Sequence, residues 1–349
     1  MKRSLFVLAS VALFAALLLG CSGSSSTASS AAPAPAAAPA APAPAPKDFS
    51  DVSIIFFPGG SEGDSFASVV YNGAVKAQGE LGCKVNYMWS SWSPDKMVSQ
   101  LKDAIAQKPD AICIMGHPGD TAMGPLIDQA RQAGIVVTSQ NSPLPVNEAK
   151  YKTEGFGYVG ADQISAGETL GNAAIQRAGL KAGDTAIVWG LKGQAGRGER
   201  TQGIINACQA AKVKVAYYEI SDAVNADASQ GTSVFAGFVA ANPTAKLIVV
   251  DHGALTSTVG TYMKAAGKNP GDIYCAGFDL SAASVDAINS GYLGCILDQQ
   301  PWLQGYLPVV QACLTVKYGF SGLHIDTGAS IIDKSNISQI APLAQQGIR

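Results

Sequence analysis

The chain has 349 residues, of which 47% are hydrophobic, and its 24 basic and 26 acidic side chains give a formal net charge of −2. Charged residues make up 14% of the chain, against about 25% in an average soluble domain, and no block of Lys and Arg occurs. A nucleic-acid partner and a polybasic membrane patch are therefore excluded, and the hydrophobic content excludes disorder for most of the chain.

The first twenty residues have the features of an export signal. Lys2 and Arg3 precede an apolar run over residues 5–19, which is shorter than the roughly 20 residues needed to span a bilayer. The run ends in Leu-Leu-Gly immediately before Cys21. This ending resembles the bacterial lipobox, in which the cysteine becomes the lipidated first residue. We therefore expect residues 1–20 to be a lipoprotein signal peptide; the alternative is an ordinary cleaved signal with an incidental cysteine.

Residues 21–50 are predicted to form a tether. Residues 22–30 are rich in serine, and residues 31–46 contain only alanine and proline. Such a tract cannot bury a core and is typical of a semi-extended spacer. A lipid on Cys21 and this spacer together predict an exported protein, anchored on the outer face of the cytoplasmic membrane or in the periplasm.

Six further cysteines follow Cys21 in the chain: Cys83, Cys113, Cys208, Cys275, Cys295 and Cys313. Exported proteins can form disulfides, and six cysteines allow 15 full pairings. Most of these residues, however, lie inside apolar strand or helix patterns, and no C-x-x-C motif occurs. We expect buried free thiols.

From residue 51 onward, apolar strand patterns alternate with helical patterns of about 12 to 16 residues. The first group of strands is predicted at residues 52–57, 84–89, 111–116 and 135–139. The second group begins near Tyr158 and contains predicted strands at residues 185–190, 213–220, 246–251, 273–278 and 293–298. Between the strands at residues 84–89 and 111–116, Ser93-Pro94-Asp95 is typical of a capped helix start. The alternation indicates α/β architecture with parallel sheets, and about ten strands divide naturally into two groups of five.

Polar residues gather where the predicted strands end. In parallel α/β sheets, ligands bind beyond the carboxyl ends of the strands. The residues at these ends are Asp64, His117, Asn141, Arg200, Asp251, Asp279 and Gln299. We therefore expect them to surround a binding site.

Several short motifs then occur in a characteristic order. They include Gly63-Asp64-Ser65-Phe66, Arg200-Thr201-Gln202-Gly203, Gly277-Phe278-Asp279 and Gln299-Gln300-Pro301. Together with the signal and tether, they resemble the ribose/galactose-type (type I) periplasmic sugar-binding proteins of ABC importers, over residues 51–333.

This resemblance implies two Rossmann-like lobes with parallel sheets, joined by a three-strand hinge. The N-terminal lobe would comprise residues 51–160 and 300–328, and the C-terminal lobe residues 161–299 and 329–349. A monosaccharide or sugar-like polyol would bind in the cleft between them and pass to an ABC permease. The resemblance implies no enzymatic activity, no cofactor and no metal. We expect a monomer, and a chemotaxis receptor is a further partner that could use the same cleft.

The resemblance also assigns roles to single positions. Asp64 matches a residue that binds sugar hydroxyls, and Phe66 one that stacks on the ring. Arg200, Asp279 and Gln299 match ligand-binding Arg, Asp and Gln, whereas Asn141 and Asp251 stand where the family usually has Asp and Asn. We include His117 and Trp302 as further candidates. Ala67 replaces a second aromatic, which Trp302, Trp89 or Trp92 could supply.

These residue types suit a sugar, because aromatic rings cover its C–H faces and carboxylates and Arg bind paired hydroxyls. With three acids, Asp64, Asp251 and Asp279, against one base, Arg200, the set favours a neutral sugar or polyol over a carboxylated one. Each residue also has a structural alternative: the acids could cap helices, and Phe66 could belong to the core.

Two other functions remain open from the sequence. One is a receptor for a nucleoside or an autoinducer-type furanose. The other is a lipoprotein esterase, because residues 59–63 match G-x-S-x-G with Ser61 as nucleophile, and Asp251 or Asp279 with His324 would preserve the order of a hydrolase triad. That motif, however, follows the first strand, whereas the hydrolase turn normally comes after several.

Overall fold

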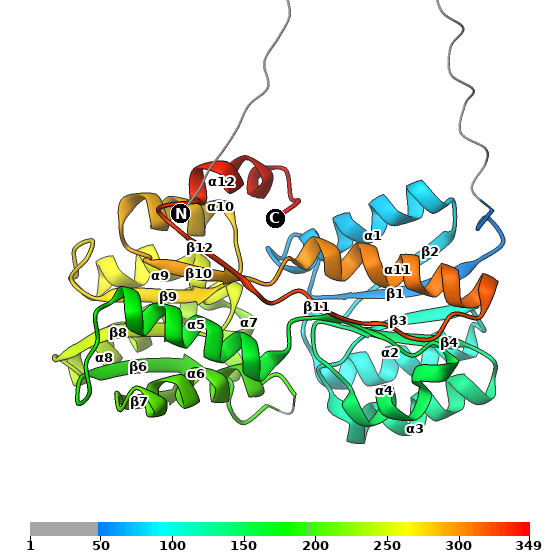
Figure 1. Cartoon of the computed structure of the whole chain (residues 1–349), viewed down its shortest axis with the longest axis horizontal. Helices are drawn as coiled ribbons and strands as arrows, with labels where there is room; N and C mark the ends of the chain where they lie inside the picture. The colour runs from blue at the N-terminus through cyan, green and yellow to red at the C-terminus, as the bar shows by residue number, and fades with distance from the viewer. Residues whose placement is uncertain (1–47, 195) are drawn as a thin grey trace, which may run out of the picture. The chain divides into compact units, whose positions relative to one another are not determined.

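The computed structural model describes residues 48–194 and 196–349, which belong to one compact unit. Within them lie two six-stranded sheets, each with helices around it (Figure 1). The leader, Cys21 and most of the tether fall outside the described residues.

The first sheet has the strand order β11-β5-β4-β3-β1-β2, and all its pairings are parallel. Its strands are β1 (Ser53–Gly59), β2 (Lys84–Trp89), β3 (Ala111–Met115), β4 (Val136–Gln140), β5 (Tyr158–Gly160) and β11 (His324–Asp326). Helices α1 (Ala67–Leu81) and α11 (Pro301–Tyr318) cover one face, and α2 (Pro94–Ala106), α3 (Gly119–Gln132) and α4 (Pro145–Tyr151) cover the other (Figure 1). We call this sheet and its helices the N-terminal lobe.

The second sheet has the order β12-β10-β9-β8-β6-β7. Its strands are β6 (Thr185–Gly190), β7 (Lys214–Glu219), β8 (Ala245–Val250), β9 (Tyr274–Phe278), β10 (Cys295–Asp298) and β12 (Ser330–Asp333), of which β12 is antiparallel to β10. Its helices are α5 (Gln163–Arg177), α6 (Glu199–Ala210), α7 (Asp222–Ala226), α8 (Thr232–Ala241), α9 (Gly253–Ala265), α10 (Ala282–Ser290) and α12 (Ile337–Gln345). We call this part the C-terminal lobe.

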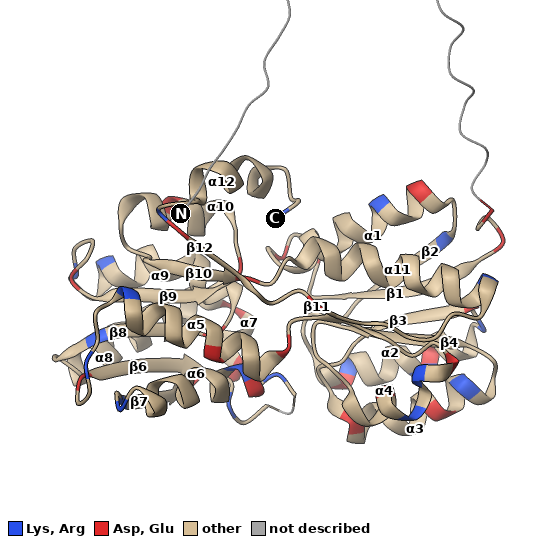
Figure 2. Cartoon of the chain, viewed as in Figure 1, with Lys and Arg blue, Asp and Glu red and all other residues tan. Residues whose placement is uncertain are grey.

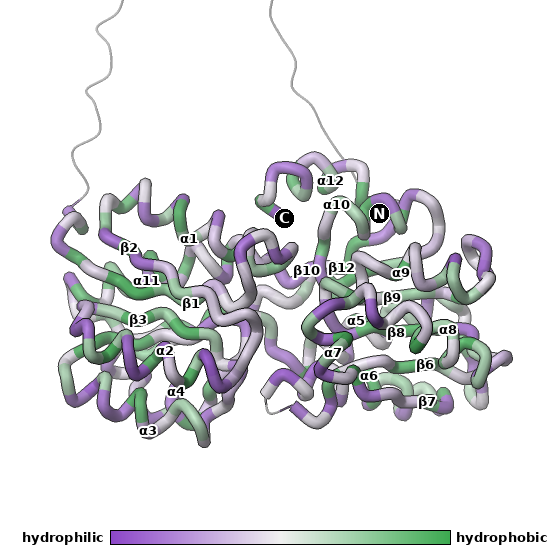
Figure 3. Tube along the Cα trace, turned by 180° about the vertical axis from the view of Figure 1, so that it is seen from behind, coloured by the Kyte–Doolittle hydropathy of each residue, from purple (hydrophilic) through white to green (hydrophobic). Residues whose placement is uncertain are grey.

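Burial on both faces explains why the strands are continuous apolar runs. Every residue of β3 and β4 is buried, as parallel strands covered by helices on both sides must be. The central strands carry the hydrophobic colour in Figure 3, whereas the charged residues coloured in Figure 2 lie mainly on helices and connecting segments.

One pair of helices in each lobe packs closely through glycines. A Cβ atom on Gly305 of α11 would overlap the backbone carbonyl of Val70 in α1. In the C-terminal lobe, a Cβ atom on Gly203 of α6 would overlap the carbonyl of Ile164 in α5. Only a residue without a side chain allows such an approach, and this contact fixes the start of α6, where Arg200 lies.

The chain crosses between the lobes three times: after β5, between β10 and α11, and between β11 and β12. Hydrogen bonds join the crossings to one another. Thr327 N–H donates to the carbonyl of Gly160 at 3.0 Å, and Gln300 Nε2 donates to the carbonyl of Thr327 at 2.9 Å. Gln300 has a left-handed backbone (φ 55°), which turns the chain from β10 into α11.

The α/β prediction with two parallel-dominated sheets is confirmed. Each sheet has six strands where five were predicted. The additional strands, β11 and β12, were not predicted, since they are only three and four residues long and partly exposed. They lack the apolar run by which the other strands are recognised.

Two local predictions are also confirmed. Ser93 caps α2 by accepting a hydrogen bond from Lys96 N–H at 3.3 Å. The six cysteines of the described residues are all buried and unpaired.

In the part of the chain that the structure covers, no helix combines the length and apolar character needed to cross a bilayer.

Candidate functional site

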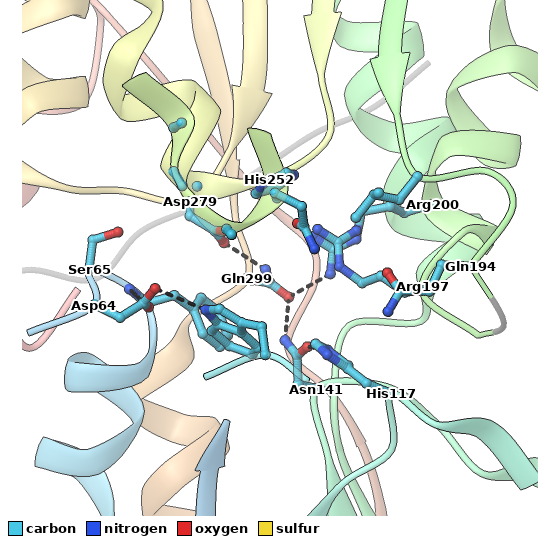
Figure 4. Close-up of a pocket in the computed structure, with 18 residues that line it drawn as sticks. Asp64, Ser65, His117, Asn141, Gln194, Arg197, Arg200, His252, Asp279 and Gln299 are labelled. Atoms are coloured by element: carbon cyan, nitrogen blue, oxygen red, sulfur yellow. Dashed lines mark hydrogen bonds between the residues drawn. The ribbon is translucent and has the colours of Figure 1, made fainter. Parts of the chain in front are cut away.

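A cavity lies beyond the carboxyl ends of strands from both sheets (Figure 4). The N-terminal lobe contributes Asp64, Ser65, Phe66, Trp92, His117 and Asn141. The C-terminal lobe and the crossing after β10 contribute Leu191, Gln194, Arg197, Arg200, Asn225, Ala226, Ala228, His252, Gly253, Ala254, Asp279 and Gln299. Seven of the nine predicted ligand-binding residues therefore line one cavity, and Asp251 and Trp302 do not.

Gln299 is the centre of a hydrogen-bond network across the cavity floor (Figure 4). Its Oε1 accepts from Asn141 Nδ2 and from Arg200 Nη2, both at 3.3 Å. Its Nε2 donates to Asp279 Oδ1 at 2.6 Å. Because Asn141 belongs to one lobe and Arg200 and Asp279 to the other, this network joins both lobes at the second crossing.

Two of these residues have left-handed backbone conformations. Asn141 follows β4 with φ 64°, and Asp279 follows β9 with φ 72°. Asn and Asp tolerate this region better than other non-glycine residues. Such strained positions gather at ligand sites, and here both turn the chain sharply at the point where a strand meets the cavity.

Arg200 is almost fully buried, with 1% of its surface exposed. Its guanidinium donates to Gln163 Oε1 at 2.6 Å and to the carbonyl of Asp251 at 3.2 Å, and lies 4.5 Å from the ring centre of Phe278. Burial lowers the pKa of Arg200 to about 9, so it stays charged at neutral pH. Burial also raises the pKa of Asp279, against the opposing effect of Arg200.

His117 is neutral in this cavity. Burial and nearby Arg197 lower its pKa to about 3, although the hydrogen bond to Asn141 opposes this shift. Its Nε2 lies 2.7 Å from Asn141 Oδ1. Since that oxygen can only accept, Nε2 carries the proton and Nδ1 is left as an acceptor.

The aromatic wall of the cavity consists of Phe66 and Trp92, whose ring centres are 5.9 Å apart. Trp92 also stacks on His117 at 5.3 Å, and its Nε1 donates to Asp64 Oδ2 at 2.9 Å. Trp92 therefore provides the second aromatic ring of the cavity, which position 67, an alanine in this chain, does not supply.

Gly59 and Gly60 make room for the Trp92 indole. A Cβ atom on Gly59 would come within 2.6 Å of Trp92 Cζ3, and one on Gly60 within 2.9 Å of its Nε1. Gly59, the first glycine of the hydrolase-like motif, and its neighbour Gly60 therefore form the seat of this ring. They were the signal that could have placed Trp92 ahead of the other tryptophans.

Trp302 lies outside the cavity, on α11. Its ring stacks on that of Tyr306, four residues later in the same helix, with ring centres 4.8 Å apart. Trp89 likewise packs on Tyr71 at 5.4 Å.

Asp64 performs both roles considered for it, since it caps α1 and lines the cavity. Its Oδ1 accepts from the backbone N–H groups of Phe66 and Ala67 at 3.0 and 2.8 Å. The other oxygen faces Trp92, so Asp64 couples the helix start to the aromatic wall.

Asp251 is fully buried behind the cavity. Its Oδ2 accepts from Leu191 N–H at 2.9 Å and from Thr201 Oγ1 at 2.6 Å. Burial would raise the pKa of Asp251, but Arg197 and His252 outweigh it and hold the pKa well below its usual range. The geometry gives Asp251 a supporting role, and the neighbouring His252 lines the cavity in its place.

The residues of the hydrolase alternative are not brought together. Ser61 Oγ donates to Ser91 Oγ at 3.1 Å, and His324 lies 2.9 Å from both Glu148 and Asp162. Among the described residues, no group of three or more His, Cys, Asp or Glu could hold a metal ion.

Comparisons with known proteins agree with this architecture. A family model described as a periplasmic binding protein domain matches residues 54–317. The chain is 30% identical over 271 residues to the xylose/arabinose-binding protein of Sulfolobus acidocaldarius, covering 72% of this chain and 64% of that protein. It is 26% identical over 250 residues to the ribose import binding protein of Haemophilus influenzae, covering 71% and 80%. The chain thus spans less than two thirds of the first of these relatives.

Solved structures show the same fold. A carbohydrate transporter from Acidothermus cellulolyticus in complex with myo-inositol matches with a TM-score of 0.73 at 24% identity, over 85% of this chain and 99% of that chain. An ABC transporter solute-binding protein from Burkholderia graminis in complex with D-arabinose matches with a TM-score of 0.73 at 22% identity, over 84% and 98%. The family model covers most of the described residues and the predicted two-lobed fold is confirmed, so the chain belongs to the periplasmic binding protein family.

Proposed function

We propose that this protein is the substrate-binding component of an ABC importer. It captures a neutral monosaccharide or polyol in the cavity between its lobes and delivers it to a membrane permease. The observation that carries the proposal is the network centred on Gln299, which brings an amide, a carboxylate and a guanidinium from both lobes to one floor. The aromatic wall of Phe66 and Trp92 lies beside this network. Polar groups for the hydroxyls and aromatic rings for the C–H faces are together what binding of a sugar ring requires.

The charges of the cavity support a neutral ligand. Arg197 Nη1 lies 3.6 Å from Asp251 Oδ2. Arg200 and Asp279 are close enough that each opposes the burial-driven pKa shift of the other. Each guanidinium thus has a carboxylate near it. A carboxylated ligand would have to compete with these carboxylates, whereas sugar hydroxyls can both donate and accept.

The ligands named for the similar proteins support a particular class of ligand for this one. The proteins named above are a xylose/arabinose-binding protein and a ribose import binding protein, and solved neighbours hold myo-inositol and D-arabinose. We propose a pentose, hexose or cyclic polyol. The proposed role is transport without catalysis, by a monomer.

Export and anchoring belong to the same proposal. Residues 1–20 would direct export, and Cys21 would carry the lipid that holds the protein beside its permease. Incorporation of radiolabelled fatty acid into the wild type but not into Cys21→Ser tests this. Labelling of the Cys21→Ser variant would contradict it.

The ligand is tested by isothermal titration calorimetry and thermal shift on the full chain, in a detergent without a sugar headgroup. The panel contains D-xylose, D- and L-arabinose, D-ribose, D-allose, D-fucose, myo-inositol and nucleosides. A ligand at 100 times its Kd stabilises the fold by about 2.7 kcal/mol, which raises Tm by several degrees. Binding of one sugar or polyol is expected. Binding of a nucleoside alone would favour the furanose receptor, and no binding at all would overturn the proposal.

A further inference from the structure

Two buried polar atoms at the cavity have no hydrogen-bond partner among the residues that the structure describes. They are Nε2 of His252 and Nη1 of Arg197, which are both buried. Both residues line the cavity (Figure 4), and Arg197 has only 6% of its surface exposed. A buried polar atom without a partner costs free energy, so each such atom in a native fold needs an explanation.

The surroundings of His252 fix its orientation and its tautomer. Its Nδ1 lies 2.8 Å from Asp251 Oδ1. Asp251 is ionised and is itself held by Leu191 N–H and Thr201 Oγ1. A carboxylate only accepts, so Nδ1 carries the proton. The neutral ring then has a lone pair on Nε2, which can accept a hydrogen bond.

Arg197 supplies the complementary group. Its Nη2 donates to the carbonyl of Asp251 at 3.3 Å. Its Nη1 lies 3.6 Å from Asp251 Oδ2, which is too far for a good hydrogen bond. One guanidinium nitrogen is therefore anchored, and the other is free to donate.

We propose that His252 and Arg197 form a ligand-reading pair in the C-terminal lobe. His252 Nε2 accepts a hydrogen bond from one hydroxyl of the ligand, and Arg197 Nη1 donates a hydrogen bond to an oxygen of the ligand. The proposal rests on the sugar-binding function and deepens it. It requires a ligand with a free hydroxyl that donates at the His252 position, and it disfavours one with only a carbonyl or an ether oxygen there.

The test is calorimetry on the full chain with whichever sugar of the panel binds, and with analogues in which one hydroxyl at a time is replaced by fluorine. Fluorine cannot donate a hydrogen bond. One fluorinated analogue should bind the wild type roughly tenfold more weakly. His252→Phe should lose roughly tenfold for the parent sugar and show no further loss with that same analogue.

His252→Gln is the matched rescue variant, because its amide oxygen can accept. It should bind the sugar more tightly than His252→Phe. Melting temperatures of the two variants check that the fold is retained.

The outcomes separate this inference from the proposed function. If the wild type binds a sugar and His252→Phe binds it equally well, the ligand-reading pair is wrong and the transport role stands. Equal losses for the fluorinated analogue in the wild type and in His252→Phe would also overturn the pair. If the wild type binds no sugar, the proposed function fails and this inference fails with it.

Discussion

Asp251 and Asp279 follow neighbouring strands of one sheet, yet they serve different purposes. Asp279 lines the cavity and holds Gln299, whereas Asp251 is fully buried and supports His252 and Arg197. The difference comes from backbone geometry, since Asp279 has a left-handed φ of 72° that turns it toward the cavity. The two carboxylates should respond differently to mutation.

Asp279→Ala should weaken sugar binding by about tenfold to a hundredfold or more, since hydrogen bonds to charged groups contribute about 1.5–3 kcal/mol each. The fold should remain stable. Asp251→Ala should instead lower the stability by about 3–5 kcal/mol, because it leaves a buried guanidinium uncompensated. Calorimetry and urea unfolding of both variants measure the contrast. Retained affinity in Asp279→Ala would contradict the site.

Trp92→Ala should reduce sugar affinity at least about tenfold, because it removes one ring of the aromatic wall. Trp302→Ala is the matched control, since that ring stacks on Tyr306 outside the cavity. The two variants are compared by calorimetry with the same sugar. Equal affinity for both would show that the Trp92 ring does not contact the ligand.

Sequence reasoning located the cavity because strand ends are recognisable: Asn141 and Asp279 directly follow β4 and β9, and Asp64 lies in the loop after β1. It could not separate Asp251 from a ligand contact, since only the side-chain partners show that its oxygens are occupied. To rank Trp92 above Trp302, it would have had to recognise that Gly59 and Gly60, more than thirty residues earlier in the chain, leave room for the Trp92 ring.

At the scale of elements, the close approach of α1 to α11 depends on glycine. A side chain on Gly305 would collide with the backbone of α1, whereas a Cβ atom on Gly79 of α1 would meet nothing within 4 Å. The long apolar strands were predictable because burial on both faces leaves a continuous pattern. The short strands β11 and β12 were not, because each owes its pairing to a crossing that only the folded chain brings into place.

Gly305→Ala should destabilise the protein by at least about 1–3 kcal/mol, as overpacked substitutions do. Gly79→Ala should stabilise it by about 0.5–1 kcal/mol, because alanine is the better residue at an exposed helix position. Thermal unfolding of the two variants beside the wild type gives the comparison. A Gly305→Ala protein as stable as the wild type would mean that the two helices can separate without cost.

At the scale of the whole molecule, His324 connects elements on both sides of the first crossing. It lies 2.9 Å from Glu148 Oε2 in α4 and 2.9 Å from Asp162 Oδ1 at the start of α5. Its ring centre is 5.0 Å from that of Tyr158 in β5. Burial alone would lower the pKa of His324, but the hydrogen bonds to the two carboxylates outweigh it and raise the pKa.

A raised pKa in the folded state means that the protonated ring stabilises the fold. This contribution is fully present below the unfolded-state pKa of about 6.5 and is lost as the pH rises through the higher folded-state value. The Tm of the wild type should therefore fall with rising pH in this window more than that of His324→Gln. Parallel pH profiles of Tm for the two proteins would contradict the assignment.

Both rings of the aromatic wall, Phe66 and Trp92, belong to the N-terminal lobe, whereas the C-terminal lobe contributes mainly polar and small side chains, among them Arg197, Arg200, His252 and Asp279. We expect this asymmetry to order the binding of the proposed sugar if the lobes separate between binding events. The ring face would then be desolvated on the N-terminal lobe first, in a fast encounter that depends little on the sugar's identity. The hydroxyls would be contacted as the C-terminal lobe closes, so differences between sugars should appear in their rates of release more than in their rates of capture.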